Sequence, residues 1–301
     1  MKLVVQVKLL PTAAQEATLA ATLRACNEAA NYTSGMAFER NAKSRNELQK
    51  LCYHEIKDRF GLSAQPAVRV VKKVVDAYTT LHAAIKSGNL GGETSKRRMK
   101  AESKPISFRR TAAQPFDDRC LSWKHDAGMV SIWTTAGRLK DIRFVGSADQ
   151  LATLRAHRQG ESDLLCRDGA WFLIATCEVP EAPQFEPTDW IGVDRGMSNL
   201  ATTSDLANYQ GRRLQRYRRW HARKRAELQA KRTVSATRRL RKRARKEHRH
   251  ATHVNHRIAK DVVAVAERTG RGIALEELQG IRDRVTVARH QRATRSSPSV
   301  A

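Results

Sequence analysis

The sequence predicts an α+β protein with several domains, and three observations support this fold class. Residues 12–87 carry apolar side chains at helical spacing, which is typical of amphipathic helices. Residues 105–180 break into short, β-like segments. Beyond residue 188, an apolar segment that ends in a carboxylate is followed by a long, strongly basic block. With 301 residues, of which 41% are hydrophobic, the chain can bury at least one core.

An amphipathic strand over residues 1–10 opens the chain. Its apolar residues alternate with polar ones, among them Lys2 and Lys8, which predicts the first strand of a small β-barrel. Thr12, followed three residues later by Gln15, has the spacing of a capping box. A helix is therefore expected to begin directly after the strand.

A helical unit is expected over residues 11–87. A second capping pattern, which begins at Ser44, predicts its second helix, and its third helix is expected from Val68 to Ile85. The segment that follows is rich in Gly, Ser and Lys, which predicts an exposed loop over residues 87–104.

The loop and the rest of the barrel are expected to fill residues 88–187. Short strands at regular spacing are typical of small barrels, and the first strand is expected to join one edge. A linker that carries Pro and acidic residues then leads to a new unit over residues 188–301. The expected barrel strands are 105–108, 129–133, 142–145 and 171–176.

The chain is strongly basic, with 56 Lys and Arg against 30 Asp and Glu and a net charge of +26. Residues 211–250, the basic block, hold 18 of these cations but only two acids. No Pro or Gly interrupts the block after Gly211, so it is predicted to form arginine-rich helices over 211–268, with a turn near Thr233. Such a charge density repels itself unless an anion neutralises it.

The basic block is therefore interpreted as a nucleic-acid-binding element, and backbone contacts rather than base reading are expected. A solvated basic face or a localisation signal is the alternative. The candidate nucleic-acid-binding residues are Arg212, Arg213, Arg216, Arg218, Arg219, Arg223, Lys224, Arg225, Arg238, Arg239, Arg241, Lys242 and Arg243.

Membrane and secreted classes are disfavoured. No apolar run approaches the roughly 18 residues of a membrane span, and Lys8 interrupts the N-terminal apolar segment too early for a signal peptide. The five cysteines are scattered, which is typical of reduced thiols in a core and gives no Cys-x-x-Cys zinc site. A cytoplasmic protein is expected, with no membrane partner.

Two carboxylates follow apolar strand-like segments. Asp194 ends residues 190–194 and precedes Gly196, and Glu276 ends residues 273–276, which are predicted to form a buried strand. Hard oxygen ligands on rigid elements suit a divalent ion such as magnesium, which could support phosphodiester cleavage. Each acid alone is weak support, because an Asp before Gly is more often a turn former.

Together with their order, these motifs make the chain resemble the TnpB (OrfB) proteins of bacterial insertion sequences, relatives of the type V CRISPR effector nucleases. The Asp194 segment resembles the first motif of a RuvC-like nuclease domain, and the Glu276 segment resembles the second. The resemblance covers roughly residues 1–290. Its matching stretches are Met1–Glu16, Ile191–Ala201, His256–Ala259 and Ala274–Arg282.

The resemblance implies a transposase-family protein that is an RNA-guided DNA endonuclease. A transposon-derived guide RNA would pair with DNA, and the helical unit and barrel would hold the hybrid. A RuvC-like domain with the RNase H fold would cut DNA with magnesium, and Asp194 and Glu276 would be its first two catalytic carboxylates and metal ligands. Such a protein would be cytoplasmic and bacterial, and associated with the nucleoid when it is bound to DNA.

The sequence also departs from the family pattern. Full-length members carry a Cys-x-x-Cys zinc ribbon and a third RuvC motif with a catalytic Asp, and this sequence has neither. The nuclease domain is therefore expected to be incomplete and C-terminally truncated, with impaired cleavage because two carboxylates under-ligate the metals. Asp283, seven residues after Glu276, is not expected to substitute for the third acid.

Three other interpretations stay open. The chain could be a nuclease-dead repressor that binds DNA under the direction of a guide. It could also be a decayed transposon fragment without activity. A plain basic RNA-binding protein is a further alternative, but it leaves the two strand-end acids unexplained.

Overall fold

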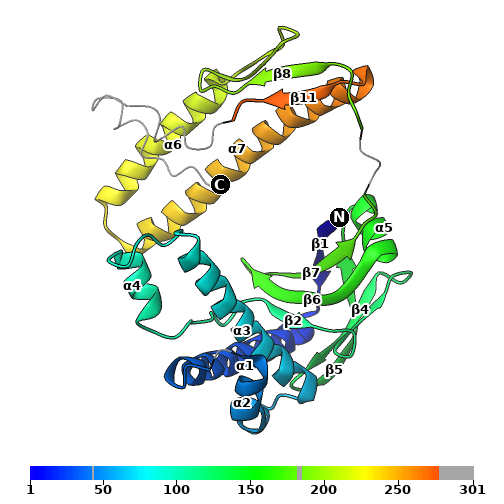
Figure 1. The fold of residues 1–301 in the computed structure, drawn as a ribbon, viewed down its shortest axis with the longest axis vertical. Coiled ribbons are helices and arrows are strands. Elements are labelled where there is room, and N and C mark those ends of the chain that lie inside the picture. Colours follow the sequence, from blue (N-terminus) through cyan, green and yellow to red (C-terminus); the bar gives the residue numbers. More distant parts are fainter. Residues whose placement is uncertain (43, 182–184, 278–301) are drawn as a thin grey trace. The chain divides into compact units, whose positions relative to one another are not determined.

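The computed structural model describes residues 1–42, 44–181 and 185–277 (Figure 1). The chain divides into two compact units, Met1–Ala182 and Pro183–Ala301. Both helices and strands occur in each unit, so the mixture of helices and strands expected from the sequence is confirmed.

The first unit contains one antiparallel sheet of seven strands, in the order β2-β6-β7-β1-β5-β4-β3. Its two outer strands, β2 and β3, are neighbours in sequence, and apolar side chains from β2, β3, β4, β6 and β7 share a single core. The sheet is therefore curled into a nearly closed barrel. The strands are β1 (Lys2–Leu10), β2 (Gln114–Phe116), β3 (Leu121–Lys124), β4 (Met129–Thr134), β5 (Gly137–Val145), β6 (Arg158–Arg167) and β7 (Ala170–Glu178), and the helix α5 (Ala148–His157) links β5 to β6.

The first strand and the cap that follows it form as the sequence predicts. Val5, Val7 and Leu9 are buried, while the polar residues between them face outward. The backbone N–H of Thr12 donates to Gln15 Oε1 over 2.9 Å, and Gln15 N–H donates back to Thr12 Oγ1 over 3.3 Å. This capping box satisfies two donors that the first turn of the helix leaves free.

Three helices pack into a second core in the first unit. Their facing sides carry small and aliphatic residues, including Ala29, Leu48 and Val70. The third helix begins at Ala64, earlier than the sequence predicted, because Pro66 lies in its first turn, where no backbone N–H donor is required. The helices are α1 (Ala13–Glu39), α2 (Arg45–Phe60) and α3 (Ala64–Lys86), followed by the short α4 (Lys96–Glu102).

Two sequence predictions between the helices and the barrel are wrong. The segment 87–104 is not entirely a loop, because it contains α4. Residues 105–108 form no strand, because the Asn31 side chain satisfies the backbone of Phe108. Phe108 N–H donates to Asn31 Oδ1 over 2.7 Å, and Asn31 Nδ2 donates to Phe108 O over 3.0 Å.

The second unit is built on a four-stranded sheet in the order β10-β9-β8-β11. The first three strands form an antiparallel meander, and β11 then pairs parallel to β8. Two long helices make the connection between β10 and β11, with a break near Thr233 as the sequence predicts. The elements are β8 (Trp190–Asp194), β9 (Asn199–Thr203), β10 (Asn208–Gln210), α6 (Arg212–Ala230), α7 (Val234–Thr269) and β11 (Gly272–Leu275).

One face of this sheet packs against the C-terminal half of α7. The buried residues of this core are few: Ile191, Val193, Ala201, Val262 and Ala266. The prediction that residues 273–276 form a buried strand is wrong in its burial, because Leu275 is 57% exposed. In the described part of the chain, β11 pairs only with β8, so its outer edge has no neighbour to cover it.

The sequence disfavoured secreted and membrane proteins, and the cysteines and helices of the structure are relevant to these two classes. Cys26, Cys52, Cys120 and Cys177 are buried, all five thiols are free, and burial raises the pKa of Cys26 to about 12. These thiols are therefore core residues of low reactivity. Within the described residues, no helix combines the length and the apolar composition needed to span a membrane.

Candidate functional site

The two candidate carboxylates lie side by side at one edge of the second sheet. Strands β8 and β11 run parallel, and their last register pair joins Val193 to Leu275. Asp194 is the last residue of β8, and Glu276 directly follows β11. Adjacent strands lie about 4.8 Å apart, so the backbones of these two acids are about one strand spacing apart. We call Asp194 and Glu276 the carboxylate pair.

The backbone after β8 also holds the pair together. Arg195 N–H donates to Glu276 Oε1 over 3.3 Å, and the Arg195 guanidinium donates to the Glu276 carbonyl over 3.0 Å. Both members of the pair are exposed. Their oxygens are therefore accessible to a ligand, but a guanidinium already contributes positive charge beside them.

Two glycines allow the close approach of α6 to the turn that follows Asp194. A Cβ atom at Gly196 would lie 2.8 Å from the Asn199 carbonyl oxygen. A Cβ atom at Gly211 would lie 2.7 Å from the Met197 carbonyl oxygen, and Gly211 N–H donates to Ser198 O over 2.8 Å. The Gly after the strand-end Asp thus has a steric cause within the turn, and Gly211 holds the start of the basic block against Met197 and Ser198, three and four residues after Asp194.

An ion pair fixes the start of β11. The Arg271 guanidinium donates to both carboxylate oxygens of Asp205, over 3.0 and 2.6 Å. The hydrogen bond from Arg271 holds the pKa of the Asp205 carboxyl below its ordinary value. This bidentate contact ties the segment before β11 to the turn after β9 and so supports the strand that precedes Glu276.

No group of three His, Cys, Asp or Glu side chains that could hold a metal ion occurs in the described residues. Asp283, which is not expected to replace the third acid, lies outside the described residues. The donor chemistry of the carboxylate pair nevertheless fits magnesium, which binds through one or two carboxylates and completes its shell with water and substrate phosphates.

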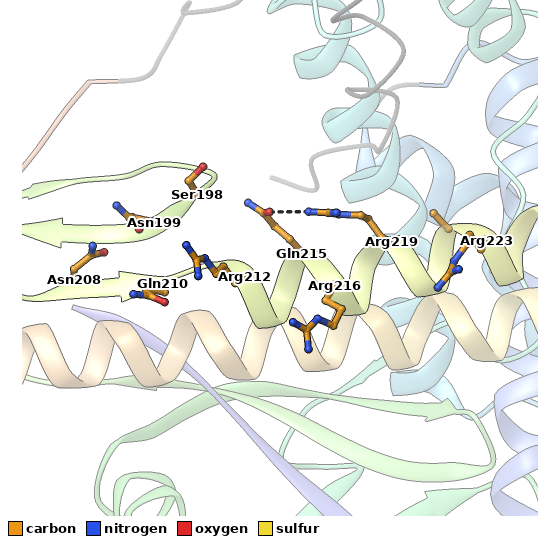
Figure 2. A pocket seen from close by; sticks show the side chains of 10 residues that line it. Ser198, Asn199, Asn208, Gln210, Arg212, Gln215, Arg216, Arg219 and Arg223 are labelled. Atoms are coloured by element: carbon orange, nitrogen blue, oxygen red, sulfur yellow. Dashed lines mark hydrogen bonds between the residues drawn. The ribbon is translucent and has the colours of Figure 1, made fainter.

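An arginine-lined cavity of about 1100 Å³ lies between α6 and the strands before it (Figure 2). Arg212, Arg216, Arg219 and Arg223 line it, and we call them the arginine stripe. Their spacing of four, three and four residues places them on one face of α6 over about 16 Å. No carboxylate is among the described residues that line this cavity.

Amide and hydroxyl side chains form the other end of the same cavity. They come from the strand ends and the first turn of α6, and Gln215 accepts a hydrogen bond from Arg219 Nη2 over 3.4 Å (Figure 2). Sequence reasoning missed these residues, because single polar residues at strand ends carry no periodic signal. They are Ser198, Asn199, Asn208, Gln210 and Gln215.

The other candidate nucleic-acid-binding residues fall into two groups. Three are engaged within the helices: Lys224 pairs with Glu227 over 2.8 Å, Arg225 pairs with Glu247 over 3.2 Å, and the Arg243 guanidinium lies 4.5 Å from the centre of the Trp220 ring. The rest are exposed on α6 and α7 outside the cavity. They are Arg213, Arg218, Arg238, Arg239, Arg241 and Lys242.

Residues 175–279 match the model of the OrfB_IS605 family, described as "Probable transposase". The match spans the carboxylate pair and both basic helices. Over these residues, the match confirms the resemblance to the TnpB (OrfB) family.

A solved structure is similar in fold to most of the chain. It is a cryo-EM structure of a Cas12f1–sgRNA–target DNA complex, with a TM-score of 0.53 and 13% sequence identity. The match covers 90% of this chain and 67% of that chain. No curated protein matches the chain.

Proposed function

We propose that this TnpB-like protein binds DNA under the direction of a transposon-derived guide RNA, and that its second unit is a RuvC-like nuclease domain. One observation supports this most strongly: the parallel pairing of β8 and β11 brings Asp194 and Glu276 to the same end of two neighbouring strands. The resemblance alone would assign these two residues from sequence motifs. Their meeting at one sheet edge is independent support for a shared phosphodiester site.

The arginine stripe is proposed to bind the nucleic-acid backbone next to this site. Arginine makes bidentate contacts to phosphate, and the absence of carboxylates among the described lining residues leaves the local charge positive. Ser198, at the near end of the cavity, follows Asp194 by four residues. A strand held along the stripe would therefore be presented to the carboxylate pair, while base pairing with the guide would supply sequence selection.

Magnesium is the proposed cofactor. When bound, it would supply Lewis-acid stabilisation of the phosphate and activation of a water molecule. Asp194 and Glu276 would hold it through carboxylate oxygens. The backbone N–H of Arg195 orients Glu276 for this role, because it donates to Oε1.

Cleavage is proposed to be slow relative to binding. Two carboxylates suit one magnesium ion rather than the two-ion clamp that stabilises both the attacking and the leaving oxygen. A second candidate function follows, namely guide-directed DNA binding without cleavage. The Arg195 guanidinium favours it, since a fixed positive charge beside the pair competes with a bound cation.

Metal-dependent cleavage by the full chain tests the proposal. The protein is purified with RNA transcribed from its own locus and challenged with a matched plasmid, with magnesium or with EDTA. We expect slow, EDTA-sensitive cutting that Asp194→Asn lowers at least about 100-fold, because a lost charged ligand removes several kcal/mol of stabilisation. DNA binding by the variant should be unchanged.

Asp261→Asn is the matched control, because Asp261 is an exposed acid on α7 outside the site. It should cut at the wild-type rate. Guide-dependent binding without any cutting would establish the second candidate function. Cutting that survives Asp194→Asn would contradict the assignment of the carboxylate pair, and binding that ignores the guide would contradict the first part of the proposal.

A further inference from the structure

The strand end of the arginine-lined cavity differs in chemistry from the arginine stripe. Asn199, Asn208 and Gln210 line it, and we call them the amide cluster (Figure 2). An arginine side chain offers only hydrogen-bond donors, whereas each amide offers a carbonyl oxygen beside an N–H group. Phosphate oxygens accept hydrogen bonds but donate none, so a phosphate would leave the amide oxygens unused. The cluster therefore suits a ligand that has donors and acceptors side by side.

A β-bulge in β9 brings the amide cluster together. Tyr209 pairs with Ala201, and both residues pack in the core against α7. The next residue, Gln210, pairs with Asn199, so β9 contains one extra residue at this point. Successive strand residues point to opposite faces, so Gln210 lies on the face away from α7, where regular alternation from Ala201 would not place Asn199. The bulge sets Asn199 opposite Gln210, and bulges that redirect a side chain are common beside active sites.

The amide cluster is available to a ligand. Its three side chains make no hydrogen bond to any other described residue, and Asn208 and Gln210 are exposed. Gln215, which also lines the cavity, is engaged instead: its Nε2 donates to Met197 O, and its Oε1 accepts from Arg219 Nη2 over 3.4 Å. Gln215 therefore positions one arginine of the stripe, while the cluster keeps its hydrogen-bonding groups free.

A strand that follows the arginine stripe would bring its bases to the amide cluster. Arg212, the first residue of the stripe, follows Gln210 by two residues, and both line the same cavity. The cavity volume of about 1100 Å³ is at the upper end of the roughly 300–1,000 Å³ typical of small-molecule sites, so a nucleotide has room. Phosphates would then lie on the arginines and a base on the amides.

We propose that the amide cluster recognises the base of an unpaired nucleotide in the strand held by the arginine stripe, and that adenine is the preferred base. Adenine carries its N6 amino donor between two acceptors, N7 on one edge and N1 on the other, so an amide can make two hydrogen bonds to either edge. Guanine presents two acceptors on its N7 edge, which suit arginine better. The proposal rests on the proposed function only in placing a nucleic-acid strand on the stripe.

The first test measures binding of short single strands without guide RNA or magnesium. Fluorescence anisotropy gives the Kd of the full chain for labelled strands of adenine, cytosine or thymine nucleotides. We expect the adenine strand to bind about tenfold more tightly than the other two. Asn199→Leu combined with Gln210→Met keeps the size of both side chains but removes the amides, and it should abolish this preference.

Two controls separate base recognition from a loss of structure. Asn255→Leu removes an exposed amide on α7 outside the cavity, and it should keep the adenine preference. Arg216→Met, on the stripe, should weaken binding of all strands by the same factor, because phosphate contacts carry no base information. The double amide variant should keep the wild-type salt dependence of binding, which shows that the stripe is intact.

The second test changes the base instead of the protein. A strand with purine in place of adenine lacks only the N6 amino group. The wild type should bind it about tenfold more weakly than the adenine strand. The double amide variant should bind both strands equally, because the partner of the amino group is already gone.

The outcomes distinguish this inference from the proposed function. An adenine preference that both the double amide variant and the purine strand remove supports the inference. Equal affinity of the wild type for all strands, or a preference that survives the double variant, would overturn it and leave the proposed function untouched. Failure to bind any strand would contradict both the proposed role of the arginine stripe and this inference.

Discussion

In the described residues, the core around the curled sheet of the first unit holds 18 buried apolar side chains and the core among its helices holds 13, whereas the core of the second unit holds five. The second unit also contains the basic block, whose facing surfaces meet through Tyr217, His221, Arg243 and Glu247. Apolar burial stabilises the first unit by itself. The second unit has little such burial and a large self-repulsion, so a polyanion should contribute much more to its stability.

The charged side chains that the first unit partly buries are paired with opposite charges. Arg69 on α3 bonds to Asp117, over 2.9 Å, and to Glu161 on β6. Burial would raise the pKa of Asp117, but its hydrogen bond and charge interaction with Arg69 hold that pKa below the ordinary value. The network ties the helices to the sheet in a place where neither charge could be left alone.

The largest expected change in the stability of either unit comes from breaking the network around Arg69. Arg69→Met leaves the mostly buried Asp117 without its cation and leaves Glu161 with only the longer ion pair to Lys72, over 3.6 Å, so it should destabilise the first unit by about 3 kcal/mol. Hydrogen exchange read by mass spectrometry reports each unit separately. Lys124→Met, which removes an exposed pair with Asp141, is the control and should cost at most about 1 kcal/mol. Equal losses for both variants would contradict the difference in burial.

A second prediction concerns the charge of the second unit. Arg216→Gln combined with Arg223→Gln should lower affinity for single-stranded nucleic acid about 10- to 100-fold at low salt. The magnitude of the slope of log affinity against log salt should fall by about 1.4, because roughly 0.7 counterions are released per single-strand phosphate contact and two contacts are lost. Fluorescence anisotropy over a salt series measures both quantities.

The control for this prediction is Arg213→Gln with Arg218→Gln, which removes two exposed arginines from the same helix outside the cavity. If the two double variants lose equal affinity and equal slope, the basic block acts as a diffuse charge. The arginine stripe would then have no special role.

The smallest effect is a pH dependence in the first unit. Burial lowers the pKa of Lys73 to about 8 from 10.5. The unfolded chain therefore binds more protons than the folded one between these values, so stability should rise with pH across this window. The expected gain is about 1 kcal/mol between pH 8 and 9. Lys73→Met should remove this part of the slope in urea unfolding, whereas the exposed Lys50→Met should keep it.

Local features of the fold could be predicted from the sequence because their causes are local. The Thr12–Gln15 capping box, the helix start after Thr233 and the strand before Asp194 each depend on residues within one turn or strand. Strand β6 was missed because Gly160 interrupts its pairing with β7 and Glu161 breaks its apolar pattern. The Arg69 guanidinium pairs with the Glu161 carboxylate, and no sequence pattern predicts a partner 92 residues away.

In the candidate site, too, local features could be predicted from the sequence and long-range ones could not. Asp194 and Glu276 could be singled out as strand-end acids, but the register that joins them spans about 80 residues and could not be predicted. The arginine stripe could be counted within the basic block, yet only the packing of α6 beside β10 selects Arg212, Arg216, Arg219 and Arg223 from the other arginines.

The place of β1 in the sheet has a consequence for synthesis on the ribosome. The strand lies between β7 and β5, and Lys2 pairs with Glu178. At about 5–20 residues per second, its partner emerges on the order of ten seconds later. Until then, β1 can pair only through Lys8–Leu10, with β5, and the rest of the strand has no partner in the sheet. An N-terminal fusion would change how far β1 is exposed before β7 is made, and should therefore change the yield of folded protein.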